Sequence, residues 1–140
     1  SQISTQIARF GGAALIIDYG NEVSTVGDTL QSVRGHAVNE ALSHSGSADL
    51  TAHLDFAALE RSIRGLVDVY GPINQGKFLR QLGIEIRAEA LTKNATESQS
   101  SDIINACRRL TEHDQMGGLF KVMALTSHGL NRPSGFVNNL

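Results

Sequence analysis

The first hydrophobic positions of the chain predict a helix followed by a strand. Ile3, Ile7 and Phe10 recur at helical spacing. The uncharged run 13–17 then predicts a buried strand, which two glycines precede and which Asp18, an aromatic residue and another glycine follow. Such a strand needs neighbours on both edges and helices on both faces, and the rest of the chain has few segments to supply them. We therefore expect the C-terminal half of a larger unit.

A polar stretch separates this strand from the next predicted helix. Residues 21–47 are rich in Gly, Ser, Thr and His, and are typical of a long functional loop or insertion, with a helical turn at 37–42. Alternating apolar residues predict a brief extended segment over 50–56. Asp55 is then placed to cap a helix that begins at Phe56.

The remaining pattern predicts further strands and helices. In chain order these are a strand at 67–70 stopped by Gly71 and Pro72, a helix capped by Asn74, a helical piece at 84–91, a polar loop at 93–99 and a helix capped by Ser101 or Asp102. The strand 119–125 is followed by no helix-length segment, so we expect it to be an antiparallel strand at the edge of the sheet. Residues 126–140 are expected to form a tail.

Composition narrows the classes of partner. The chain has 140 residues, of which 41% are hydrophobic, enough for the core of one globular domain. A net charge of -2 and a sequence pI of about 6.2 provide no basic surface for nucleic acid or anionic lipid. The apolar runs are far shorter than the ~20 residues that a membrane helix needs, so no membrane insertion is expected.

Histidines and carboxylates that could hold a metal ion crowd into one region of the chain. They are His36, His44, Asp49, His53 and Asp55. Their spacing fits no compact metal motif, so no metal site is expected, although a metal-dependent hydrolase remains an alternative. The sequence also lacks the Gly-x-Ser-x-Gly turn of a serine hydrolase. It lacks a phosphate-binding glycine loop as well, because Gly11 and Gly12 precede the strand instead of following it.

Three carboxylates lie beside predicted strand ends or caps. Asp18, Asp49 and Asp55 at one edge of a sheet could hold a guanidinium group through paired, charge-assisted hydrogen bonds. A purely structural role is favoured for Asp55, the predicted cap. For Asp18 the two interpretations stay open.

A set of motifs in order along the chain resembles the C-terminal half of the MidA family of S-adenosylmethionine-dependent methyltransferases. The match covers about residues 11–125. Its segments are LIIDYG (15–20) after Ala13, His36, ADLTA (48–52), LDF (54–56), GPINQ (71–75) with FL (78–79) and LGI (82–84), and MG (116–117) with FKV (120–122).

The resemblance implies a fold and a division into parts. The family has the α/β fold of class I, Rossmann-like methyltransferases, with seven strands of which the last is antiparallel. The strand ending at Asp18 would be the fifth, 67–70 the sixth and 119–125 the seventh. Residues 1–125 would form the C-terminal part of the methyltransferase domain, with an insertion at about 21–55 near the substrate, and 126–140 a tail.

The resemblance also implies an activity. Eukaryotic members assist the assembly of mitochondrial respiratory complex I, so the expected function is arginine methylation of a protein, a subunit of that complex, in the mitochondrial matrix. A bacterial member would be cytoplasmic. The family's main S-adenosylmethionine-binding motifs precede the fifth strand, so this chain is expected to bind the donor only with its upstream half. A non-catalytic interaction module or partner subunit without a donor site is the alternative.

The residues carried over from the family would form one wall of the site. Asp18, Tyr19 and Gly20 are expected on the donor side, and Asp18 or Asp49 are the candidate catalytic residues. The expected substrate side is formed by His36, Thr51 and Asp55.

Overall fold

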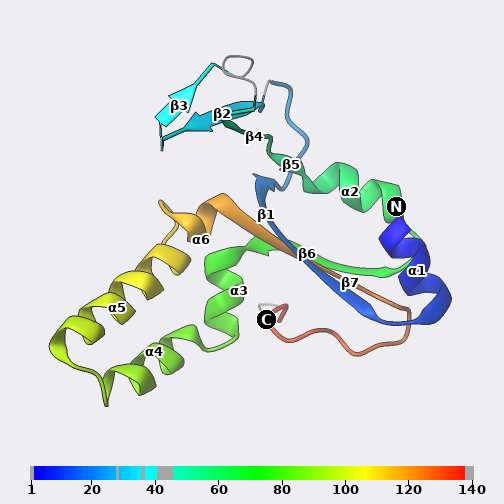
Figure 1. Ribbon diagram of the computed structural model, residues 1–140. Coiled ribbons are helices and arrows are strands. Elements are labelled where there is room, and N and C mark those ends of the chain that lie inside the picture. Colours follow the sequence, from blue (N-terminus) through cyan, green and yellow to red (C-terminus); the bar gives the residue numbers. More distant parts are fainter. Residues whose placement is uncertain (1, 28, 36, 41–45, 138–140) are drawn as a thin grey trace.

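The chain folds into a four-stranded mixed sheet with helices on it and a small second sheet at one end (Figure 1). The computed structural model describes residues 2–27, 29–35, 37–40 and 46–137. The helices are α1 (Gln2–Phe10), α2 (Phe56–Ile63), α3 (Gln75–Gln81), α4 (Ile84–Thr92), α5 (Glu97–Thr111) and α6 (Met116–Leu119). The strands are β1 (Ala13–Asn21), β2 (Gln31–Arg34), β3 (Ala37–Asn39), β4 (Asp49–Thr51), β5 (Leu54–Asp55), β6 (Asp68–Asn74) and β7 (Phe120–Thr126).

The last strand lies inside the large sheet. The strand order is β5-β1-β7-β6, and β7 pairs antiparallel with both β1 and β6. The predicted antiparallel direction is confirmed, but the predicted edge position is wrong. The reason is that both faces of β7 are apolar and buried, with Val122 and Ala124 on one side and Met123 and Leu125 on the other.

Two hydrophobic clusters cover the two faces of β7. On one face, α1 and α2 contribute Ile7, Phe56 and Ile63 to a cluster with Met123 and Leu125. On the other face, the cluster consists of Phe78 from α3, Phe136 from the end of the chain, and Val122 and Ala124. Helices α1 and α2 thus lie on one side of the sheet, with α3 and the C-terminal segment on the other.

Strand β6 continues past its predicted stop. Gly71 and Pro72 form an irregularity at which the pairing with β7 shifts between Tyr70 and Ile73, and the strand resumes to Asn74. Among the described strands, β6 lies at an edge of the sheet, where proline is tolerated because its missing N–H leaves no neighbouring strand unpaired. Asn74 is the predicted N-cap of α3 by position, although its side chain makes no capping hydrogen bond.

Helices α4 and α5 pack on one another and project from the sheet (Figure 1). Helix α5 begins earlier than predicted, because Thr96 and Gln99 form a capping box: Gln99 N–H donates to Thr96 Oγ1 at 3.3 Å, and Thr96 N–H to Gln99 Oε1 at 3.0 Å. Ser101 and Asp102 therefore lie inside the helix and do not cap it.

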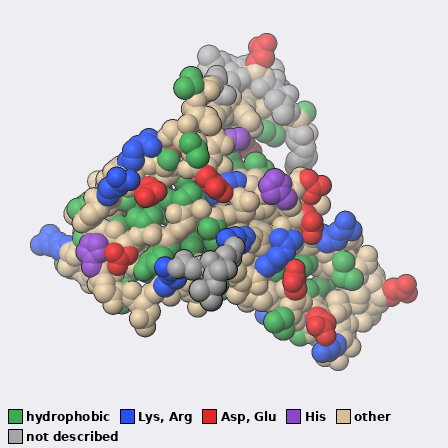
Figure 2. All heavy atoms as spheres, turned by 180° about the vertical axis from the view of Figure 1, so that it is seen from behind, with side chains coloured by type: hydrophobic (Ala, Val, Ile, Leu, Met, Phe, Trp, Pro, Cys, Tyr) green, Lys and Arg blue, Asp and Glu red, His purple; other side chains and the backbone are tan. Residues whose placement is uncertain are grey.

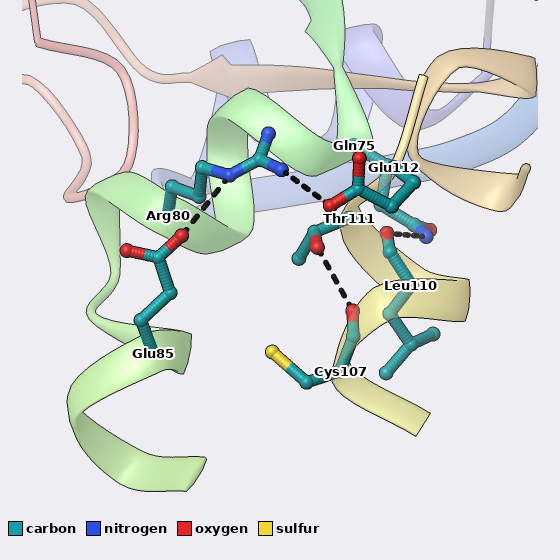
Figure 3. Close-up of polar contacts among 7 residues, drawn as sticks. All are labelled: Gln75, Arg80, Glu85, Cys107, Leu110, Thr111 and Glu112. Carbon is teal, nitrogen blue, oxygen red and sulfur yellow. Dashed lines mark hydrogen bonds and ion pairs between the residues drawn. The ribbon is translucent and has the colours of Figure 1, made fainter. Parts of the chain in front are cut away.

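Close backbone contact joins these helices to α3. Gly76 lies so near the end of α5 that a Cβ atom there would be 2.1 Å from the Thr111 carbonyl oxygen. Gln75 Nε2 donates to the Leu110 carbonyl oxygen at 3.0 Å. Figure 3 shows Arg80 between the start of α4 and the end of α5, with its Nε 3.2 Å from Glu85 and its Nη2 3.4 Å from Glu112. These contacts fix the orientation of the projecting helices.

The predicted insertion contains the second, three-stranded sheet. Its order is β3-β2-β4, with both pairings antiparallel, and it lies beyond the end of β1 (Figure 1). The predicted helical turn at 37–42 is wrong as far as the structure describes this stretch, since 37–39 form strand β3. The amino-acid sequence of 37–39 is compatible with a strand as well as a helical turn, and the pairing of β3 with β2 decides between them.

The C-terminal segment packs on the domain. It forms neither helix nor strand over 127–137, but Phe136 is buried against Phe78 at a centroid distance of 5.3 Å. Gly135 approaches the Phe78 ring so closely that a Cβ atom would lie 2.4 Å from it. This segment completes the cluster on its face of the sheet. None of the helices in the described ranges is long and apolar enough to cross a membrane.

Replacing Gly76 with alanine is expected to lower the free energy of unfolding by about 1–3 kcal/mol, because α3 and α5 must separate to admit the methyl group. Chemical denaturation measures the change. Ala90→Ser, which also adds one heavy atom but at an exposed position of α4, should change it by less than ~0.5 kcal/mol. Equal stability of Gly76→Ala and the unaltered protein would contradict the close contact.

Candidate functional site

The predicted donor-side residues lie where β1 ends, beside β5. Asp18 and Tyr19 are half-buried and Gly20 is buried. Strand β5 runs parallel to β1, pairing Gly20 with Leu54 and Asn21 with Asp55. Ligands of open α/β sheets bind at the carboxyl ends of parallel strands, and β1, β5 and β6 all end at this edge.

Asp18 keeps one carboxylate oxygen available. Its Oδ1 accepts a hydrogen bond from the Tyr19 N–H at 2.8 Å, and its Oδ2 has no partner within the described residues. Lys121 on β7 is paired with Asp18 in the register, but its Nζ donates to the Gly118 carbonyl oxygen and not to the Asp18 carboxylate. The free oxygen is suited to accept from a donor or guanidinium N–H.

Tyr19 belongs to an aromatic cluster that the sequence did not reveal. Its ring meets Phe120 edge-on at a centroid distance of 5.5 Å and His53 at 5.8 Å. Phe120 is its neighbour on β7, and His53 directly precedes β5. These edge-to-face contacts fix the orientation of the Tyr19 ring, which points to the opposite face of β1 from Asp18.

Gly20 allows β5 to approach β1. A Cβ atom at this position would lie 2.1 Å from the Leu54 carbonyl oxygen. No rotation of a side chain can relieve a contact between Cβ and backbone, so only glycine permits this spacing. Gly20 therefore permits the close pairing of β1 with β5, and this pairing sets the position of Asp55.

Asp55 caps helix α2, as predicted. Its Oδ1 accepts from the Ala58 N–H at 2.8 Å. A hydrogen bond from Ser24 lowers the pKa of Asp55 below its ordinary value, and the Ala58 N–H and the charge of Arg61 act in the same direction. Arg61 Nη2 in turn donates to Ser24 Oγ at 3.0 Å. The segment after β1 is thereby joined to α2.

The other predicted substrate-side residues lie apart from Asp18. Asp49 and Thr51 are on β4 of the small sheet, opposite Val33 and Gln31, and no hydrogen bond or ion pair within the described ranges links either of them to Asp18. His36 and His44 lie outside the described residues. Among those described, no group of three or more His, Cys, Asp or Glu side chains could hold a metal ion.

Sequence reasoning did not place His53, Phe120 or Lys121 at this edge. In the sequence, His53 is a candidate metal ligand, and Phe120 and Lys121 belong to the last strand and to the FKV motif of the family resemblance. Their proximity depends on the register that pairs Tyr19 with Phe120. A single sequence gives no signal for that register.

The fold is the C-terminal part of a class I methyltransferase sheet, in which an antiparallel last strand lies between its two neighbours. The family described as "Putative S-adenosyl-L-methionine-dependent methyltransferase" matches residues 1–73. The chain belongs to this family of methyltransferases.

The names of similar proteins are consistent with membership of this family. The chain is 39% identical over 128 residues to "Protein arginine methyltransferase NDUFAF7, mitochondrial" of Mus musculus, covering 91% of this chain and 29% of that protein. It is 37% identical over 125 residues to the NDUFAF7 homolog of Drosophila melanogaster, covering 88% and 28%. The chain thus spans under a third of the length of these relatives.

Two solved structures from Burkholderia thailandensis are similar along nearly the whole chain. One matches with a TM-score of 0.77 and 26% identity, covering 96% of this chain and 38% of the other. The second is described as a likely methyl transferase and, like the first, as a member of the COG1565 superfamily. It was crystallised bound to S-adenosyl-homocysteine and matches with a TM-score of 0.75 and 26% identity, covering 96% of this chain and 37% of the other.

Asp55 is expected to make stability depend on acid pH. Because folding lowers its pKa, its ionised form stabilises the fold fully above the ordinary value of 3.8, and this contribution is lost as the pH falls through the lower pKa of the folded state. Asp55→Asn should therefore lower the melting temperature most at neutral pH, with the difference narrowing below 3.8. Thermal unfolding at a series of pH values measures this.

Asp114→Asn, which alters an exposed carboxylate in the turn after α5, is the matched control and should show no such convergence. A constant difference between Asp55→Asn and the unaltered protein at all pH values would mean that the charge of Asp55 is not what stabilises the cap.

Proposed function

We propose that this chain is the C-terminal part of an S-adenosylmethionine-dependent protein arginine methyltransferase. The observation that carries the proposal is the 39% identity, over 91% of this chain, to a relative named a protein arginine methyltransferase. Residues 1–125 form the C-terminal part of the catalytic domain, with an insertion at about 21–55. Residues 126–140 form a tail, whose described part packs on that domain through Phe136.

The donor site is completed by an upstream half. Residues 13–19 of β1 have no strand on the side away from β7 within the described part of the chain. Leu15 and Ile17 point away from the α1–α2 cluster and are 51% and 46% exposed. Figure 2 shows hydrophobic side chains open to solvent over this face of the sheet. An unpaired strand edge and an apolar face are what a further strand and helix would cover.

In this proposal Asp18, Tyr19 and Gly20 form one wall of the donor site. S-adenosylmethionine supplies the methyl group from its sulfonium sulfur. The Oδ2 of Asp18, which has no partner among the described residues, would accept a hydrogen bond from the donor or from the arginine guanidinium. Phe120 and His53 hold the ring of Tyr19 on the other face of β1. Since methyl transfer is an in-line displacement, this wall acts mainly by aligning the two reactants.

The small sheet provides the substrate side. Asp49 on β4 is exposed and is the second candidate to face the guanidinium. Thr51, Asp55 and His36 are the other residues proposed for the substrate side. The protein substrate is a subunit of respiratory complex I, and the site of action is the mitochondrial matrix. The mitochondrial names of the relatives and the ordered motifs of the sequence support this assignment. For a bacterial protein the site of action would be the cytoplasm.

A non-catalytic interaction module is the second candidate. It is favoured by the sequence itself, in which Gly11 and Gly12 precede β1 and no phosphate-binding glycine loop follows a strand. Under this alternative the open edge of β1 still pairs with another chain, but no methyl donor is bound. A measurement of donor binding separates the two.

Calorimetric titration of S-adenosylmethionine should show binding to the chain joined to its upstream half and none to these 140 residues alone. The reason is that one wall of a site provides too few contacts to repay the cost of immobilising the donor. Binding by the short chain would place the whole donor site here, and the proposal of an upstream half would fail. Absence of S-adenosylmethionine binding by both proteins would favour the interaction module.

Asp18→Asn in the joined protein should reduce kcat/KM for arginine methylation by roughly tenfold or more, because a charge-assisted hydrogen bond is lost. A raised Kd for S-adenosylmethionine would assign Asp18 to the donor, and a raised KM for the protein substrate alone would assign it to the guanidinium. Asp49→Asn should affect only the protein substrate. Asp102→Asn, on the exposed face of α5, serves as the charge-matched control and should leave both constants unchanged.

A further inference from the structure

The helical hairpin formed by α4 and α5 has an open groove between its two helices. The hairpin projects from the sheet (Figure 1), no side chain of α4 is buried, and in α5 only Thr111 is. The groove has a volume of about 230 Å³ and is lined by apolar side chains at helical spacing on both helices. These are Ile84, Ala88 and Leu91 on α4, and Ile103, Cys107 and Leu110 on α5. The described residues thus leave an apolar surface of the hairpin uncovered.

A second hollow on α5 adjoins this groove. It has a volume of about 240 Å³, and Ala106 lines both hollows. Asp102 and Arg109 also line the second hollow, so they lie on the same side of the helix, about 10 Å apart along its axis. Both are exposed, and neither side chain makes a hydrogen bond or ion pair within the described part of the chain. A carboxylate and a guanidinium therefore flank Ala106 and remain available.

This arrangement of charges is complementary to itself. When two copies of α5 pack antiparallel about a two-fold axis next to Ala106, Asp102 of each copy lies opposite Arg109 of the other. A parallel arrangement would instead bring like charges together. The small side chain of Ala106 lets the two helices approach closely at the axis. The charge pattern therefore selects a second copy of this protein as the partner, in one orientation.

The hairpin is large enough for a weak interface. Helix α5 has 15 residues and is therefore about 22 Å long, and two packed helices present a face about 20 Å wide. Each copy would bury roughly 400 Å², which is below the standard size of a stable protein interface. We therefore expect a Kd of about 10–100 μM. Arg87, which also lines the groove, is exposed, so its charge can stay in solvent at the rim.

We propose that two copies of the protein associate through the α4–α5 hairpin as a two-fold dimer. The two α5 helices lie antiparallel, the apolar groove side chains form a shared core as in a four-helix bundle, and two Asp102–Arg109 pairs flank the axis. The interface contains no residue of the proposed donor or substrate side, so it is independent of the methyltransferase proposal. At the nanomolar concentrations of an enzyme assay the protein would be monomeric, so changes at Asp102 leave the catalytic constants unaffected.

Sedimentation velocity of the chain joined to its upstream half, from about 1 to 500 μM, tests the dimer. It should show a reversible monomer–dimer equilibrium with a Kd in the range given above, weakened by added salt. A protein that stays monomeric throughout this range would overturn the proposal. This is also the result expected if the upstream half covers the groove.

Exchange of charges tests the orientation. Asp102→Arg and Arg109→Asp should each weaken the dimer by roughly tenfold, because the two-fold axis turns two attractive pairs into two repulsive ones. The double variant Asp102→Arg/Arg109→Asp should restore the original Kd to within about threefold. Arg108→Asp makes the same change at an exposed residue of α5 that lines neither hollow, and should have little effect. Failure of the double variant to restore association, or equal weakening by Arg108→Asp, would overturn the pairing.

Ala106→Arg should leave the protein monomeric, because it places two large cations against each other at the axis. Melting temperatures check that each variant is folded, and the charge exchange keeps the test valid if Ala106→Arg is not. An undiminished dimer of folded Ala106→Arg would contradict the proposed axis. Binding of S-adenosylmethionine by the same protein should be unaltered. Failure of the dimer thus leaves the proposed methyltransferase function as it was.

Discussion

The double pairing of β7 is the constraint on which the rest of the structure depends. This strand bonds to β1 on one edge and to β6 on the other, so it joins the beginning of the chain to its middle. Both its faces are buried, and Val122 and Met123 have no exposed surface at all. Truncating such side chains typically costs about 2–5 kcal/mol each, so β7 is the part of the sheet least able to change. Every feature at the carboxyl edge is positioned relative to it.

Close backbone contacts at glycines join β5 to the sheet at one place and helices α3, α5 and α6 to one another at another. Gly20 brings β5 against β1, which places Asp55 beside Asn21 and His53 against the ring of Tyr19. At the other end, Gly76 and Gly117 bring α3 and α6 against the backbone of Thr111, which fixes the end of α5. In both places the missing side chain determines a distance between elements that no repacking of side chains could provide.

The two edges of the large sheet differ in what they offer. Within the described residues, 13–19 of β1 have an unpaired edge with an apolar face beside it, and Asp18 at the end of β1 has one carboxylate oxygen without a partner. Under the proposed function an upstream half of the protein covers this surface, in keeping with the 29% of the mouse relative that the chain spans. Beside the β6 edge, α3 and the C-terminal segment cover one face of the sheet through Phe78 and Phe136.

The sequence by itself determined the elements whose signal is local. The uncharged run of β1, the Asp55 cap of α2 and the antiparallel last strand were all predicted, as was the family. Tertiary structure alone decided the position of β7 inside the sheet, the β3 strand in place of a helical turn, and the continuation of β6 through Pro72. It also brought His53 and Phe120 to Tyr19, and Arg132 to Tyr70. The physical reason is that strand order and register arise from pairing between segments that are distant in the sequence. The free energy gained when two strands pair depends on the side chains of both, so the sequence of one segment does not predict its partner.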